Sequence, residues 1–381
     1  MQLFRDSETR SNKGYMQVTM DQPFYEPGNT VTGTIFMRVT TPIMRARGIS
    51  LEVKGGGKNS FMRFWTTIEG DGESQEIVHH EEKMKHAKKF LHYKNNVWQS
   101  PPEIAPGDYT IAFSFVLPDK IPSSLIFKAS KGDRENPKAK VKYFAKAVLD
   151  CEGEDMKHKA VLVIREKPVA LETGNVIKET SEIKTWGCCA QGTSSLSAEF
   201  AKNVYTPAET AEGDLKIDNS NCKVKVSEVK FSIEQVLKQK IGHHTHKEVR
   251  TIIKKEIEGP AANEGDWKKE MGLDLSKIKY EVATEKKKKG KTKKISKEDA
   301  FQMASLQPAC HTKKFSNEYY LCVTTKYEGC VCCVDLPDAR MKMTIVPIVN
   351  PECFGFVPPS DWNGQQLGQF NVDLNYDTDS D

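Results

Sequence analysis

Long apolar stretches are absent from this sequence. Charged residues make up 28% of its 381 positions, and no uncharged run is long enough to cross a bilayer as a helix. The first ten residues, MQLFRDSETR, lack the apolar core that a secretory signal needs. We therefore expect a soluble, cytosolic protein. A chain of this length has room for two or three domains, each large enough to bury its own core.

Motifs for catalysis or cofactor binding are also missing. The run Gly55 to Gly57 is not followed by the Lys-Ser/Thr pair and helix of a phosphate-binding loop, and no nucleophile elbow occurs. The segment HHEE at 79–82 resembles the start of a zinc-protease motif, but Met84 stands where the second His is required. The histidines at 243, 244 and 246 follow a predicted strand end, which favours a surface turn. The sequence predicts no enzymatic activity, metal or cofactor.

Disulfide bonds are not expected either. Ten cysteines are few for a chain of this length, and the adjacent pairs Cys188-Cys189 and Cys332-Cys333 suit reduced thiols. A two-residue turn predicted at Glu328-Gly329 would place Cys330 and Cys333 on opposite faces of a hairpin, which disfavours a metal site. Burial of the cysteines as small apolar side chains is favoured. Palmitoylation of Cys188-Cys189, near the expected domain junction, is the alternative.

A strong overall field is absent, because the net charge is only +4. An electrostatic partner would therefore have to meet a local cluster. The clearest cluster, KKKKGKTKK at 286–294, predicts a solvated loop or an extended hairpin tip. Its lysines are Lys286, Lys287, Lys288, Lys289, Lys291, Lys293 and Lys294. They fit an anionic membrane surface, and the alternative is a solubilising loop without a partner. Nucleic acid is not expected, because no aromatic residues interleave with the lysines.

What the sequence does contain is a succession of short alternating segments separated by Pro and Gly. Tyr109 to Leu117 and Val141 to Leu149 alternate apolar and polar residues, as half-buried strands do. A short amphipathic helix is allowed at 84–91, around Met84, Ala87, Phe90 and Leu91. The pattern as a whole predicts an antiparallel β-sandwich.

Residues 25–39 and 205–219 repeat one pattern, YEPGNTVTGTIFMRV and YTPAETAEGDLKIDN. At an offset of 180 residues the copies match without a gap at four positions, which are Tyr25 and Tyr205, Pro27 and Pro207, Thr30 and Thr210, and Gly33 and Gly213. Each copy predicts a strand, a Pro turn and a second strand. A duplication of this length predicts two similar domains rather than a solenoid.

The turns of the two copies differ in chemistry. In the first copy, Pro27 and Gly28 supply the negative and positive φ values that a type II turn demands. In the second copy, Pro207 is followed by Ala208 in place of the glycine, and a residue with a Cβ disfavours positive φ. The second copy is therefore predicted to form a type I or open turn.

Several motifs in order carry a family resemblance. In the first half, Y.PG..V.G.I is followed by PG.Y...FSF.LP..IPSSL and by V.Y...A.L. In the second half, CCAQGTSSLSAEFAKNVYTPAET precedes IDNSNCKVKVSEVKFSIEQ, YYLCVTTKY and MTIVPI. From about Tyr15 to Val349 the chain resembles the arrestin family, in its alpha-arrestin or arrestin-domain-containing branch. The resemblance implies an all-β fold of two tandem arrestin-like, immunoglobulin-like antiparallel β-sandwiches.

The expected parts of the chain follow from these patterns. They are a disordered N-terminus at 1–13, an N-terminal sandwich at 14–166, an interdomain linker at 167–190, a C-terminal sandwich at 191–350 with a lysine-rich insertion at about 280–300, and a flexible, acidic-ended tail at 351–381, unless that tail docks.

The resemblance implies a non-enzymatic adaptor or scaffold in the cytoplasm, at endosomes or the plasma membrane. Such a protein binds membrane-protein tails or trafficking machinery in sorting and endocytosis, and sheet edges offer it backbone pairing to extended peptides. The alternative is a fixed subunit of a large assembly, such as a retromer-like coat or a cytoskeletal or ciliary complex, docked through the basic loop. Many alpha-arrestins recruit ubiquitin ligases through Pro-Pro-x-Tyr, but PPSD at 358–361 has Asp in place of Tyr.

Overall fold

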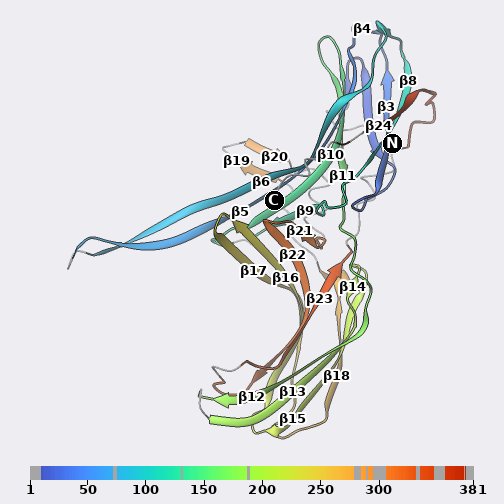
Figure 1. Cartoon of the computed structure of the whole chain (residues 1–381). Helices are drawn as coiled ribbons and strands as arrows, with labels where there is room; N and C mark the ends of the chain where they lie inside the picture. The colour runs from blue at the N-terminus through green and yellow to red at the C-terminus, as the bar shows by residue number, and fades with distance from the viewer. Residues whose placement is uncertain are drawn as a thin grey trace. The chain divides into compact units, whose positions relative to one another are not determined.

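The computed structural model describes residues 10–71, 75–129, 132–186, 189–278, 285–288, 291–294, 306–331, 335–346, 357–372 and 374. Almost all regular structure in this part of the chain is strand, with one short 3-10 helix, η2 (Leu275–Lys277). None of the described helical structure is long and apolar enough to cross a membrane. The chain forms two compact units (Figure 1). Unit 1 comprises Met1–Lys167, Thr284–Gln302 and Val349–Asp381, and unit 2 comprises Pro168–Ala283 and Met303–Ile348.

The first sheet of unit 1 has five strands in the order β1-β2-β3-β8-β24. They are β1 (Arg10–Ser11), β2 (Gly14–Met20), β3 (Thr30–Val39), β8 (Gly107–Val116) and β24 (Gly364–Val372). Neighbours are antiparallel except β24, which runs parallel to β8. A separate two-stranded sheet joins β4 (Ile43–Met44) to β7 (Glu103–Ile104).

The second sheet of unit 1 has the order β11-β10-β5-β6 and is antiparallel. Its strands are β11 (Met156–Leu162), β10 (Lys138–Asp150), β5 (Gly48–Glu69) and β6 (Glu76–Trp98), with β9 (Leu125–Lys128) also paired to β10. Every second residue of β10 is buried, from Ala139 to Leu149, because this face packs into the core. The residues between them form the outer face of the sheet.

Strands β5 and β6 are unusually long, with 22 and 23 residues, and extend past the rest of their sheet as a two-stranded ribbon (Figure 1). The helix allowed at 84–91 is therefore wrong, since this segment lies within β6. Met84 pairs with Phe61 and Leu91 with Gly55 in the β5–β6 ladder. The ladder pairs one side of this segment's backbone with β5, and this outweighs a weak helical pattern.

Unit 2 is a second pair of sheets. One has the order β12-β13-β15-β18, and the other has the order β14-β23-β22-β16-β17 with β21 paired to β22. The first contains β12 (Thr173–Thr185), β13 (Cys189–Lys202), β15 (Thr210–Cys222) and β18 (Trp267–Asp274). The second contains β14 (Val204–Tyr205), β16 (Val226–Ile241), β17 (His244–Ile257), β21 (Cys310–His311), β22 (Phe315–Tyr327) and β23 (Asp338–Ile345). All pairs are antiparallel except β14 with β23.

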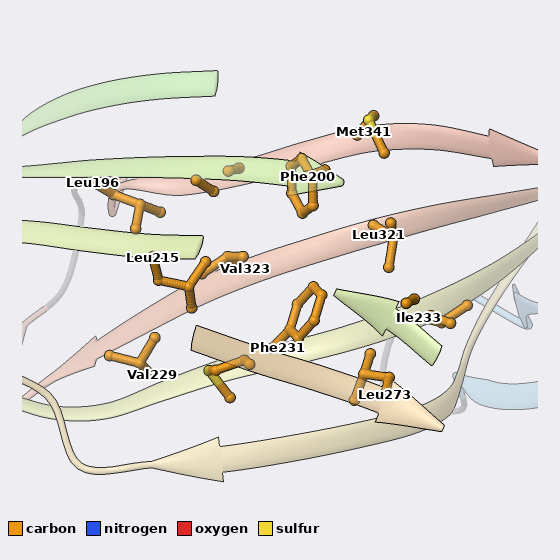
Figure 2. Close-up of a cluster of buried hydrophobic side chains, with 14 of the residues drawn as sticks. Leu196, Phe200, Leu215, Val229, Phe231, Ile233, Leu273, Leu321, Val323 and Met341 are labelled. Carbon is orange, nitrogen blue, oxygen red and sulfur yellow. The ribbon is translucent and has the colours of Figure 1, made fainter. Parts of the chain in front are cut away.

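The core of unit 2 fills the space between these two sheets (Figure 2). Phe200 on β13 and Phe231 on β16 lie with ring centroids 6.3 Å apart, and both are fully buried. Leu215, Leu321 and Val323 pack in the same cluster. Side chains from both sheets thus meet in one apolar layer, and the predicted all-β fold of two antiparallel sandwiches is confirmed.

The expected linker at 167–190 is corrected by the structure. Thr173 to Thr185 form β12, which pairs with β13 along almost its whole length. The sequence shows no alternating apolar pattern here because β12 is an edge strand, in which Ile183 is the one fully buried residue. Cys189 begins β13 and pairs with Thr185 at the end of β12. The 13 residues of β12 span about 40 Å, so Cys189 lies that far from the start of β12. The expectation that Cys189 lies near the domain junction is therefore wrong.

The expected hairpin at Glu328-Gly329 is also corrected. Strand β22 returns through β23, with Thr324 opposite Asp338, so the connection spans 328–337. Cys330 lies in this connection and is exposed. Cys188, Cys332 and Cys333 lie outside the described residues.

The two ends of the chain are more ordered than composition indicated. Of the expected disordered segment 1–13, Arg10 and Ser11 pair with β2, and residues 1–9 lie outside the described part. Of the expected flexible tail 351–381, residues 364–372 form β24, so this part of the tail docks. Residues 351–356, 373 and 375–381 lie outside the described residues.

Candidate functional site

The repeated turn places a buried tyrosine in parallel backbone pairing in each unit. Tyr25 and Tyr205 are each only 1% exposed. Tyr25 forms a parallel bridge with Ile164, and Tyr205 pairs in parallel with Ile345. The backbone after each partner donates back to the tyrosine carbonyl, from Arg165 at 3.0 Å and from Val346 at 2.9 Å. The turn therefore holds Tyr25 beside the segment that follows β11 in unit 1, and holds Tyr205 beside β23 in unit 2.

The first turn has type II geometry, with Pro27 and Gly28 at its two central positions. The Asn29 amide donates to the Glu26 carbonyl at 3.0 Å, and Gly28 has a φ of +81°. The Tyr25 hydroxyl donates to the Thr32 carbonyl at 2.8 Å and accepts from the Gln22 amide at 3.1 Å. The turn is thus fixed from both sides by hydrogen bonds.

The second turn places Pro207 and Ala208 at the same two central positions, because the Glu209 amide donates to the Thr206 carbonyl at 3.1 Å. Pro207 is half-buried and Ala208 is exposed, and neither has a positive φ. The Glu209 carboxylate accepts from Lys202 Nζ and from the Thr206 amide, each at 2.5 Å. These hydrogen bonds, with Lys202 the larger contribution, lower the pKa of Glu209. In this turn the Glu209 carboxylate, through its hydrogen bonds, stabilises the conformation that the glycine stabilises in the first turn.

The two prolines are therefore structural residues of their turns. Pro27 and Pro207 each precede the residue that differs between the copies, Gly28 or Ala208, and each presets the negative φ of the first central position. The shared proline fixes the start of the turn, and the following residue sets its type.

Gly33 and Gly213 both lie on the core faces of their strands, but their surroundings differ. A Cβ on Gly33 would lie 2.4 Å from the Thr19 carbonyl oxygen and 2.5 Å from the Phe113 ring. A Cβ on Gly213 would lie 3.4 Å from Phe231, which is an ordinary contact. The first position has no space for a side chain, whereas the second has some.

The lysine cluster at 286–294 forms a hairpin of β19 (Glu285–Lys288) and β20 (Lys291–Lys294). Lys286 pairs with Lys293, and Lys288 pairs with Lys291. Lys289 lies outside the described residues. The hairpin belongs by its contacts to unit 1, although it is inserted in the sequence of unit 2.

A second basic surface was missed from the sequence, and we call it the lysine face. It consists of six cross-strand rows on the outer face of β11, β10, β5 and β6. Its lysines, exposed or half-buried, are Lys54, Lys58, Lys85, Lys89, Lys94, Lys138, Lys140, Lys142, Lys146, Lys157 and Lys159. Glu52 is the one carboxylate in these rows. The signal was present in KAKVKYFAK at 138–146, where lysines alternate with core residues.

The docked tail is held by a group of contacts around Arg38. Its guanidinium pairs with Asp108 at 2.5 and 2.8 Å and with Asp361 at 2.9 Å. It also lies over the Trp362 ring, 5.4 Å from the centroid. The Asn363 amide donates to Asp108 at 3.0 Å, and the hydrogen bond from Arg38 lowers the pKa of Asp108. These contacts fix the residues that precede β24.

Each unit buries one charged side chain within the described residues, and the two differ in their partners. Arg165 in unit 1 is 7% exposed and lies over Phe24, 4.2 Å from the ring centroid. Among the described residues no carboxylate pairs with it, its Nε is buried without a hydrogen bond, and burial lowers its pKa to about 10. A buried charge without an anion is unfavourable in free energy, so this position is the uncompensated one of the two.

Glu318 in unit 2 is 8% exposed but well compensated. Its carboxylate contacts Lys342 at 2.6 Å, Lys238 at 3.2 Å and His311 at 3.4 Å. Burial raises its pKa, but the hydrogen bonds from the two lysines outweigh this and bring it to about 2. We regard Glu318 and its three basic partners as an ion cluster that stabilises the fold.

The histidine motifs do not assemble a metal site. His80 lies on β6 and stacks on Trp65 across the ribbon, with centroids 5.1 Å apart. His243 is in the two-residue turn between β16 and β17. Within the described ranges, no group of three or more His, Cys, Asp or Glu side chains is placed to hold a metal ion.

Comparisons with known proteins bear on both units. A model of the arrestin (or S-antigen) N-terminal domain matches residues 16–169, and a model of the arrestin (or S-antigen) C-terminal domain matches residues 190–350. The chain is 28% identical over 213 residues to arrestin domain-containing protein A of Dictyostelium discoideum, covering 54% of this chain and 35% of that protein. It is 24% identical over 265 residues to arrestin domain-containing protein 17 of Caenorhabditis elegans, covering 65% of this chain and 58% of that protein. The matches therefore span less than two thirds of either relative.

Proposed function

This chain belongs to the arrestin family, with relatives in the arrestin-domain-containing or alpha-arrestin branch, and we propose that it is a non-enzymatic adaptor for membrane-protein tails in intracellular sorting. It acts in the cytoplasm and at endosomal or plasma membranes. Its partners are extended protein segments rather than small molecules.

The observation that carries this proposal is the pairing of β24 with β8. An extended segment from far along the chain adds to a sheet edge in parallel, from Gly364 opposite Asp108 to Val372 opposite Phe115, with one register shift between Gln366 and Gly368. Most of its side chains are exposed, so the backbone ladder supplies much of the contact. An extended tail of another protein can add to an edge by the same ladder, without a dedicated pocket.

Edges of the required kind occur in unit 2. Strands β12 and β17 end their sheets and have 13 and 14 residues. Val176 on β12 and Val249 on β17 are 50% and 47% exposed, so each edge presents an apolar side chain beside its backbone. Backbone pairing would give affinity, and these side chains would give a preference for apolar residues in the partner.

Arg165 adds a chemical preference to this function. An acidic or phosphorylated side chain in the partner would neutralise the buried guanidinium, and charge-assisted pairs of this type are strong. Replacement by an apolar residue of similar length removes a buried, uncompensated charge, so it should not unfold unit 1. Arg165→Met therefore separates partner binding from folding.

The test is affinity purification of the tagged full chain from native cells, beside Arg165→Met and the matched surface variant Arg47→Met, since Arg47 is exposed. We expect the wild type and Arg47→Met to recover a mixture of membrane proteins in substoichiometric amounts, and Arg165→Met to lose those with acidic tails. Recovery of one salt-resistant complex at fixed stoichiometry would contradict the adaptor and support a structural subunit.

A further inference from the structure

The charged side chains of the lysine face are almost all positive. Its single carboxylate, Glu52, already contacts Lys54 at 3.6 Å and His92 at 3.8 Å. The next carboxylates on the same face of β10 and β6, Asp150 and Glu81, lie beyond the two ends of the six rows. Like charges at cross-strand spacing repel one another, so an external anion would reduce the repulsion between these lysines. We propose that the lysine face binds the anionic surface of a phospholipid membrane.

The chemistry of the face favours a membrane over a specific anion. All of its cations are lysines, and none of the six rows contains an arginine. Arginine is the residue suited to bidentate recognition of a single phosphate or carboxylate, whereas lysine acts as a point charge. A set of point charges matches a surface on which the headgroups are mobile and numerous.

The shape of the face agrees with this partner. Six rows spaced by two residues along the strands, over three to four strands, make a surface of roughly 35 by 15 Å. Phe144, the aromatic residue of the face, is covered by Lys159, whose Nζ lies 3.8 Å from the ring centroid. His92 is then the one other ring in the six rows, and a single exposed imidazole is not the series of aromatic rings on which successive bases stack.

The ribbon of β5 and β6 continues this surface with apolar residues. Ile68 and Ile77 pair across the ribbon and are 68% and 62% exposed. Strand alternation puts them on the same side of the ribbon as Lys58 and Lys85, which belong to the lysine face. Basic charge combined with an exposed apolar pair supplies the two signals that stable membrane attachment requires.

The experiment is vesicle co-sedimentation of the full chain at low salt. The vesicles are phosphatidylcholine, alone or with about a third phosphatidylserine. The test variant replaces Lys58, Lys85 and Lys89 with Gln, and these three are exposed without carboxylate partners among the described residues. We expect the wild type to bind the anionic vesicles only, and the variant to bind them roughly a hundredfold more weakly.

Two controls keep the result specific to this face. Gln at Lys216, Lys247 and Lys326, exposed lysines of unit 2, makes the same change in net charge and should leave binding within about twofold of the wild type. Circular dichroism and a thermal midpoint equal to the wild type's show that each variant is folded. Ile68→Ser with Ile77→Ser should keep binding at low salt and lose it at lower salt concentrations than the wild type does.

Three outcomes would overturn the proposal. The first is equal binding by the test variant and the unit 2 control. The second is a loss of binding only when the lysines of the β19–β20 hairpin are replaced with Ser, which would assign the membrane contact to that hairpin. The third is binding of a polyglutamate peptide by a chain that does not bind anionic vesicles, which would assign the face to an acidic protein partner.

Discussion

In unit 1 the repeated turn depends on Gly28, whereas in unit 2 the equivalent turn depends on the carboxylate of Glu209. Both turns hold a buried tyrosine in parallel pairing, with Ile164 after β11 in unit 1 and with Ile345 of β23 in unit 2. The first uses a backbone conformation that other residues disfavour, and the second uses hydrogen bonds and an ion pair. The arrangement after the duplication is the same, but the interactions that hold it respond differently to mutation and pH.

Gly33 and Gly213 should show the largest difference between the units. Gly33→Ala places a methyl group against the Thr19 carbonyl and the Phe113 ring, so it should destabilise unit 1 by about 3 kcal/mol. Gly213→Ala meets Phe231 at 3.4 Å and should cost less than about 1 kcal/mol. Urea unfolding of both variants, followed by near-UV circular dichroism, measures the difference. Equal losses of stability would show that the two strands are packed alike.

The tyrosines should differ next. Tyr25→Phe removes a hydroxyl that donates to the Thr32 carbonyl and accepts from the Gln22 amide, and should cost about 2 kcal/mol because two part-buried hydrogen bonds are lost. The Tyr205 hydroxyl is buried without a hydrogen bond of ordinary geometry, so Tyr205→Phe should change the free energy of unfolding by less than about 0.5 kcal/mol. The same urea titration compares them, and a larger loss at Tyr205 would contradict the assignment.

The duplicated sandwich was predictable from sequence because its signals are local. Alternating residues such as those of β10, and proline turns such as those at Pro27 and Pro207, depend on close neighbours in the chain. The outer strands β12 and β24 were missed for the opposite reason. Their sequences, TGNVIKETSEIKT and GQQLGQFNV, bury few side chains and become strands only because a partner edge is present.

The candidate surfaces were harder to predict, since they depend on register. The lysines of 138–146 were in view as polar residues of a half-buried strand, but lysines of β5, β6 and β11 join them only once the strands are paired. No sequence motif around Arg165 indicates that it is buried. It follows Ile164, the partner of Tyr25, whereas Val346 occupies the matching position in unit 2, and only the fold shows that the arginine is buried without an anion among the described residues.

The smallest expected difference is in acid, and it concerns Glu209. Its pKa is lowered in the folded state, so its contribution is fully present above the ordinary value of 4.5 and is lost as the pH falls below it. Because the side chain is 37% exposed, this contribution should be no more than about 0.5 kcal/mol. Glu209→Gln should therefore lower the stability of unit 2 slightly at neutral pH and make it less dependent on pH between about 5 and 3. In unit 1, Gly28→Ala strains a positive φ and brings a methyl group to 2.8 Å from Asp119 Oδ1, so it should cost at least about 1 kcal/mol at both pH values. Thermal unfolding at pH 7 and at about pH 3 measures all three proteins, and a pH-independent difference between the wild type and Glu209→Gln would mean that the carboxylate acts only as a hydrogen-bond acceptor.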